Sequence, residues 1–119
     1  MKFNIVLLTV LIAILACGTV EDEESLQMLA KGDTYDDVRS GARLILNYDA
    51  ATRAFVGTVE NTTSSTLQRV RVEVHLSNGT ELGPTMPSYL PLPPGEKMNI
   101  KLDASGESFS TWSAHAEVG

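Results

Sequence analysis

Residues 69–76 read RVRVEVHL, and this stretch carries the clearest structural pattern in the chain. Val70, Val72, Val74 and Leu76 alternate with four charged or polar residues, so every second side chain is apolar. Successive side chains of a β-strand point to opposite faces, and β-branched residues pack well on a sheet. The stretch therefore predicts a strand with one buried face and one solvent-facing face.

Segments with strand character continue on both sides of this stretch. Five of them are expected to be strands: residues 42–48, 55–60, 88–92, 97–103 and 112–118. Turn signals such as Asn78-Gly79 separate the segments about every ten residues, and the first two segments make a hairpin. The predicted fold class is all-β, namely an immunoglobulin-like antiparallel β-sandwich of six or seven strands. A small barrel is the alternative.

Two aromatic residues differ in their expected surroundings. Trp112 is in phase with the apolar residues Ala114 and Ala116, so we expect it to anchor the core. Tyr89 lies between two prolines, on a segment expected at the edge of the fold. We take Tyr89 as a possible contact residue for a partner.

The N-terminal segment has the composition of a targeting signal. Residues 5–16 form an almost unbroken apolar run that follows a single basic residue, Lys2. As a helix this run spans about 18 Å, well short of the roughly 30 Å hydrocarbon core of a bilayer. Such a length is typical of the apolar region of a signal peptide. We therefore predict a signal helix, removed by cleavage, over residues 1–16.

The end of this run resembles a known processing motif. Residues 14–18 read ILACG and resemble the lipobox of bacterial lipoproteins, with Leu15 standing where that family has a smaller residue. The resemblance implies a diacylglycerol on the sulfur of Cys17, cleavage just before it, and a lipid-anchored, extracytoplasmic place in a bacterial envelope, at the outer membrane where the host has one. The alternative is an ordinary secretory signal with an incidental cysteine. Cys17 is the only cysteine, so an internal disulfide is excluded.

Acidic residues are concentrated ahead of the predicted domain. Between residues 21 and 37 there are seven acids and one base, Lys31, whereas the rest of the chain from residue 42 is nearly balanced. We predict a flexible acidic tether over residues 17–41 and one sandwich domain over residues 42–119. The net charge of −6 does not indicate nucleic-acid binding.

Parts of the domain resemble a known family. The segments are FVGTVEN at 55–61, LQRVRVEVHLSNG at 67–79 and LPPGE at 92–96. Together they resemble the FxLYD domain of prokaryotic secreted and membrane proteins, although Leu76-Ser77-Asn78 stands where that family has Leu-Tyr-Asp. The resemblance implies an extracytoplasmic β-sandwich module and brings no catalytic residues.

Candidate chemistry is limited to two histidines, His75 and His115. Both are expected on solvent-facing sides of strands, and they would share a metal only if their strands were neighbours. The sequence shows no carboxylate or cysteine that completes a recognisable ligand set, so no metal site and no cofactor is predicted. No Ser-His-Asp spacing and no phosphate-binding loop is recognisable, so the protein is not expected to be an enzyme.

Two functions therefore stay open. The first is an envelope-anchored lipoprotein whose non-enzymatic sandwich module binds a partner protein, with membrane attachment through Cys17. The alternative is a periplasmic or extracellular carrier of a small ligand or metal that uses His75 and His115. A hydrolase is the least favoured reading.

Overall fold

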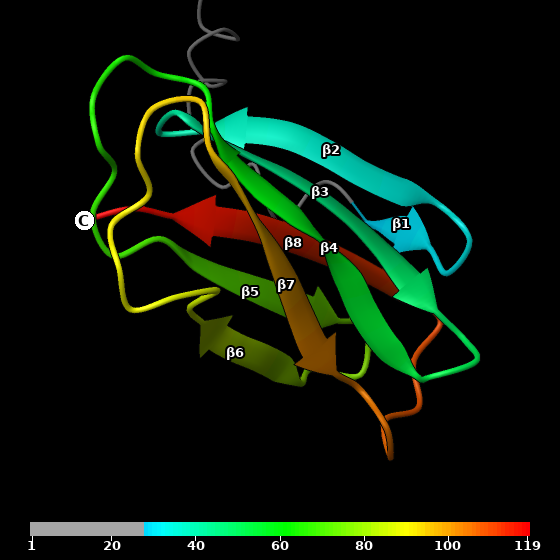
Figure 1. The fold of residues 1–119 in the computed structure, drawn as a ribbon. Coiled ribbons are helices and arrows are strands. Elements are labelled where there is room, and N and C mark those ends of the chain that lie inside the picture. The colour runs from blue at the N-terminus through cyan, green and yellow to red at the C-terminus, as the bar shows by residue number, and fades with distance from the viewer. Residues whose placement is uncertain (1–27) are drawn as a thin grey trace, which may run out of the picture.

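The described part of the chain, residues 28–119, consists of strands and loops. These residues are seen in a computed structural model, and the predicted signal peptide, Cys17 and the rest of the predicted tether up to residue 27 lie outside them. Eight strands are present: β1 (Leu29–Ala30), β2 (Thr34–Arg39), β3 (Ala42–Asp49), β4 (Ala54–Asn61), β5 (Arg71–Leu76), β6 (Glu81–Thr85), β7 (Lys97–Asp103) and β8 (Thr111–Glu117) (Figure 1). Within residues 28–119, no helix is long and apolar enough to cross a membrane.

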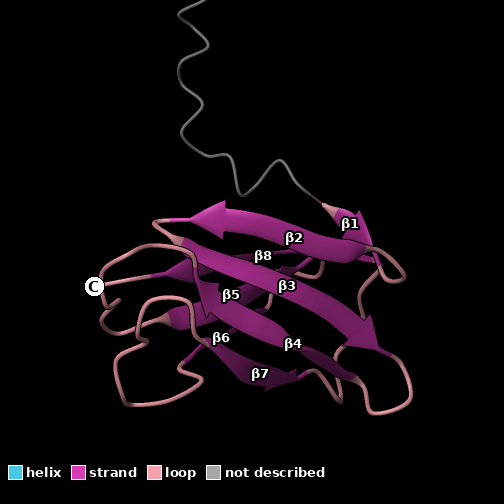
Figure 2. Ribbon diagram, turned by 45° about the horizontal axis from the view of Figure 1, so that its top comes forward, coloured by secondary structure: helices cyan, strands magenta, loops and turns pink. Residues whose placement is uncertain are grey.

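The strands form two antiparallel sheets that pack face to face (Figure 2). One sheet has the order β1-β8-β5-β6 and the other β2-β3-β4-β7. β3, β4 and β7 adjoin in the order of strands A, B and E of an immunoglobulin sheet, and β5 and β8 adjoin as C and F do. The predicted immunoglobulin-like β-sandwich is confirmed, with eight strands in place of six or seven.

The core lies between the two sheets, and alternate residues of the strands point into it. Val72, Val74 and Leu76 face inward from β5, as predicted, and meet the inward residues of β3, β4 and β7. Trp112 is fully buried, and its ring centroid lies 4.8 Å from that of Phe55. The prediction that Trp112 anchors the core is confirmed.

The predicted tether is wrong for residues 29–39, which form β1 and β2. Tyr35 is buried in the core, while Arg43 of β3 donates two hydrogen bonds to Asp36, at 2.9 and 2.8 Å. Ser40 and Gly41 both have positive φ, as the two-residue turn of a hairpin requires. An edge strand buries few side chains and tolerates charged residues that point outward. The acidic composition of this segment therefore favoured a tether over a strand in the sequence analysis.

The expected edge strand at 88–92 is also absent. Leu92 makes only an isolated bridge with Leu67, and the strand forms earlier, at β6. Proline lacks the N–H that a ladder needs, and three prolines lie in or beside 88–92. β6 accommodates Pro84 because it is an edge strand with a register shift against β5.

Candidate functional site

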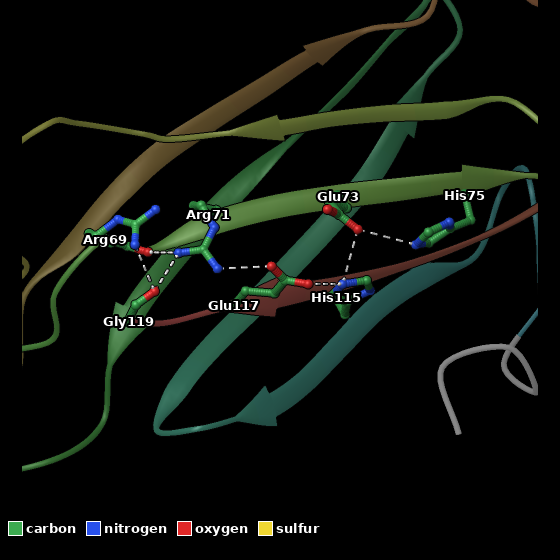
Figure 3. A network of polar contacts seen from close by, with 7 residues as sticks. All are labelled: Arg69, Arg71, Glu73, His75, His115, Glu117 and Gly119. Carbon is green, nitrogen blue, oxygen red and sulfur yellow. Dashed lines mark hydrogen bonds and ion pairs between the residues drawn. The ribbon is translucent and has the colours of Figure 1, made fainter. Parts of the chain in front are cut away.

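A polar network covers the outer face of β5 and β8 (Figure 3). The inward direction of Val72 and Val74 turns the odd-numbered residues of β5 outward. The pairing of β5 with β8 then sets polar side chains opposite one another, in the pairs Arg71–Glu117, Glu73–His115 and His75–Ser113. Directly opposed side chains on one sheet face are close enough to interact.

Glu73 joins the two histidines. Its Oε1 lies 3.2 Å from Nε2 of His115 and 3.5 Å from Nε2 of His75. The imidazole rings stack with centroids 5.2 Å apart and an interplanar angle of 19°. Glu117 Oε2 lies 3.0 Å from the same His115 nitrogen. One imidazole nitrogen therefore faces two carboxylates from neighbouring strands.

At the other end of the network, Arg69 and Arg71 hold the residues at the C-terminal end of β8. Arg71 donates to Glu117 Oε1 at 2.9 Å and to the carbonyl oxygen of Gly119 at 3.0 Å. Arg69 donates to the same carbonyl at 3.3 Å. This end of the network is satisfied and fixes the position of the Glu117 carboxylate.

The prediction that both histidines are exposed is wrong for His115, which is only 3% exposed. Its ring lies against His75 and between two carboxylates, and these groups cover it. The His75 side chain is 36% exposed, yet its Nε2 is buried. Within the described residues, His75 Nε2 and His115 Nδ1 have no hydrogen-bond partner. Buried polar atoms without a partner are uncommon and indicate an incomplete site.

The carboxyl groups of the network have opposite pKa shifts. Burial, together with the nearby charges of Glu117 and Glu81, raises the pKa of Glu73. Hydrogen bonds from His115 and Arg71 lower the pKa of Glu117. The fold therefore disfavours a charge on Glu73 and favours one on Glu117.

Glu73→Gln is expected to stabilise the protein at neutral pH. A raised carboxyl pKa means that the wild-type protein loses stability as the pH rises past about 4.5, the ordinary value. The amide removes this loss, so Tm measured at pH 7 in a chelator should rise. The gain should vanish below about pH 4, where Glu73 is protonated in both states. A lower Tm for the variant at pH 7 would contradict this.

The structure brings together three potential metal ligands, Glu73, His75 and His115. One donor atom of each lies within 4.8 Å of the others. The sequence pointed to the two histidines and set the condition that their strands be neighbours, which β5 and β8 fulfil. It missed Glu73, although the period of two already placed Glu73 on the same face as His75.

Tyr89 lies elsewhere, on the long connection between β6 and β7 (Figure 1). Its side chain is 92% exposed, and that of Leu90 is 73% exposed. The next residues return to the core, where Leu92 is buried and its carbonyl accepts a hydrogen bond from Asn61 Nδ2 at 2.9 Å. Tyr89 and Leu90 thus form an exposed apolar tip on an anchored loop.

A shallow hollow of about 500 Å³ lies on the outer face of β4 and β7. It is lined by Val56, Gly57, Thr58, Asn99, Ile100 and Lys101. Neither histidine lines this hollow, and neither does any residue from 86 to 91 on the β6–β7 connection. The hollow is therefore separate from the polar network and from the exposed tip at Tyr89 and Leu90.

Comparison with known proteins yields no relative: no protein-family model, no curated protein and no solved structure matches the chain. The resemblance to the FxLYD domain stays a prediction from its residues. Arguments about function therefore rest on the geometry of the described residues and on the sequence motifs.

Proposed function

We propose that this protein is a lipid-anchored envelope protein whose sandwich domain binds a partner protein and catalyses no reaction. The observation that carries the proposal is the exposure of two adjacent apolar residues, Tyr89 and Leu90, on an anchored loop. Tyrosine offers a large amphipathic surface and is enriched in protein interfaces. The lipobox resemblance of residues 14–18 supports the anchor, and the FxLYD resemblance supports an extracytoplasmic place.

The loop is preorganised for contact. Pro87 and Pro91 flank the tip and restrict its backbone, and the Leu90 amide donates to Ser88 Oγ at 3.0 Å. Leu92 holds the base through its bridge with Leu67. A loop that is ordered before binding loses less entropy on association, which favours affinity.

Binding through the loop is favoured over addition of a partner strand. Strand addition needs an unguarded sheet edge. Two of the four outer strands carry features that oppose it: Pro84 interrupts β6, and β7 presents Lys97 and Lys101. Prolines and lysines on edge strands discourage pairing with another chain.

A Cys17→Ala variant should leave the membrane. Without the sulfur, no diacylglycerol is attached, and each buried CH₂ of an acyl chain contributes about 0.8 kcal/mol to anchoring. Fractionation of host cells should move nearly all of the protein from the membrane pellet to the soluble extracytoplasmic or precursor fraction. Membrane retention equal to that of the unaltered protein would refute lipid anchoring at this residue.

Partner capture should depend on the loop tip. We expect crosslinking of the full-length protein in its own host's envelope to capture a reproducible partner, identified by mass spectrometry. A Tyr89→Ala/Leu90→Ala variant should reduce this capture at least tenfold, since central aromatic contacts commonly contribute about 2 kcal/mol or more.

The matched control is Val38→Ala, which truncates a half-exposed apolar residue on β2. Its capture should equal that of the unaltered protein. If the double variant captures the partner as well as Val38→Ala does, or if nothing is captured by the folded protein, the proposal fails.

A second candidate function, carriage of a metal ion, is favoured by a separate observation, the grouping of Glu73, His75 and His115.

A further inference from the structure

We propose that Glu73, His75 and His115 form a binding site for a divalent first-row transition-metal ion, with Zn²⁺ as the reference ion. The site lies on the outer face of β5 and β8 (Figure 3), whereas the proposed partner contact lies on the connection between β6 and β7. The inference is therefore independent of partner binding.

The separations of the donor atoms suit a four-coordinate ion. With metal–ligand bonds of about 2.0–2.1 Å, neighbouring donors of a tetrahedral site lie about 3.3–3.4 Å apart. Glu73 Oε1 lies 3.2 Å from His115 Nε2 and 3.5 Å from His75 Nε2, so two of the three separations have this length. The third, between the two histidine nitrogens, is within 4.8 Å.

An unsatisfied donor atom marks the same place. Nε2 of His75 is buried, and within the described residues it has no hydrogen-bond partner. A buried polar atom without a partner destabilises the fold, whereas a lone pair on this nitrogen directed at an ion would be satisfied. The contact of this nitrogen with Glu73 Oε1 is 3.5 Å long, and a bound metal ion would give it a closer partner.

The charge of the site also calls for a cation. The carboxyl groups of Glu81 and Glu117 act on Glu73, and the guanidinium of Arg71 pairs with Glu117. Among the described residues of this network, three carboxyl groups, those of Glu73, Glu81 and Glu117, lie with one carboxylate-paired guanidinium, that of Arg71, so acidic groups outnumber it.

The donor types select the ion. Two imidazoles and one carboxylate suit Zn²⁺, Cu²⁺ or Ni²⁺. Ca²⁺ and Mg²⁺ prefer six or more oxygen ligands and would bind poorly here. A fourth position remains, and the nearest further donor is Glu117, whose Oε2 lies 3.0 Å from His115 Nε2.

Zn²⁺ titration tests the site directly. The full-length protein is purified in detergent with a tag that lacks histidine, stripped with a chelator, and titrated calorimetrically with ZnCl₂ and separately with CaCl₂. We expect one Zn²⁺ per chain, no binding of Ca²⁺, and shifts of the ¹⁵N resonances of both imidazole rings. Saturating Zn²⁺ should also raise Tm by several degrees, because the ion binds the folded state.

Substitutions locate the site. His75→Gln and Glu73→Gln should each weaken Zn²⁺ binding at least tenfold, while Glu96→Gln, on the exposed loop before β7, should bind as the unaltered protein does. Glu73→Gln is expected to fold at least as well as the unaltered protein, so its loss of binding cannot come from unfolding. Absence of Zn²⁺ heat and of imidazole shifts overturns the proposal. Unchanged binding by His75→Gln also overturns it.

Discussion

Gly57→Ala is expected to unfold most of the protein. A Cβ at this position would lie 1.8 Å from the carbonyl oxygen of Ile45 and 2.9 Å from Cα of Leu46. Both are backbone atoms of β3, so no side chain can move aside to relieve the clash. Relief requires that β3 and β4 separate in the middle of their pairing, where Gly57 stands opposite Leu46.

The expected loss exceeds that of ordinary overpacking, which costs about 1–3 kcal/mol. A small domain without a disulfide has a total stability of about 5 kcal/mol, so this loss approaches the whole. Urea denaturation followed by circular dichroism measures it. Gly32→Ala is the matched control, because a Cβ there meets nothing within 4 Å. Equal urea midpoints for the two variants would show that β3 and β4 do not approach this closely.

Trp112→Ala is expected to destabilise the protein by about 3–5 kcal/mol. The side chain is fully buried against Phe55, and its indole N–H donates to the carbonyl of Ala30 at 2.9 Å. Removal leaves a cavity in the core and takes away one of the two hydrogen bonds that the Ala30 carbonyl accepts, the other coming from the Asp33 amide at 3.0 Å. The urea midpoint should fall close to zero denaturant.

Trp112→Phe separates the two contributions. It keeps a ring against Phe55 and loses the hydrogen bond, so a smaller loss of about 1–2 kcal/mol is expected. Hydrogen exchange at Leu29 and Ala30 should accelerate more than exchange in β5. Tyr89→Ala serves as an aromatic truncation at an exposed site and should leave the urea midpoint unchanged. Equal midpoints for Trp112→Ala and Tyr89→Ala would contradict the role of Trp112 in the core.

The acidic segment ahead of β3 shows where local composition misleads. Acidic residues dominate residues 33–37, and on composition alone they favour a solvated spacer. The segment becomes β2 because β3 lies alongside it, supplies Arg43 for Asp36, and leaves room for Tyr35 in the core. Asp36 meets Arg43 because the turn at Ser40 and Gly41 folds β2 back along β3, and Tyr35 is buried because the core lies beside it, so the acidic composition of the segment reports neither contact.

The sequence predicted individual residues of the candidate metal site, but not how they come together. The alternation in residues 71–76 places Glu73 and His75 on one face of a strand, and the sequence contains only one other histidine. The approach of His115 depends on the order β1-β8-β5-β6, which joins residues about forty positions apart. The burial of His115 follows from that same pairing.

The alternation of apolar residues was enough to predict the strands that carry it, the buried face of each, and the core position of Trp112. Side chains in a strand point alternately to two faces, so this information is local. Three features emerge only in the folded chain: β2 is a strand, residues 88–92 form a loop, and Glu73 contacts both imidazoles. Strand order and edge pairing depend on contacts between distant segments, and a local pattern does not specify its neighbour.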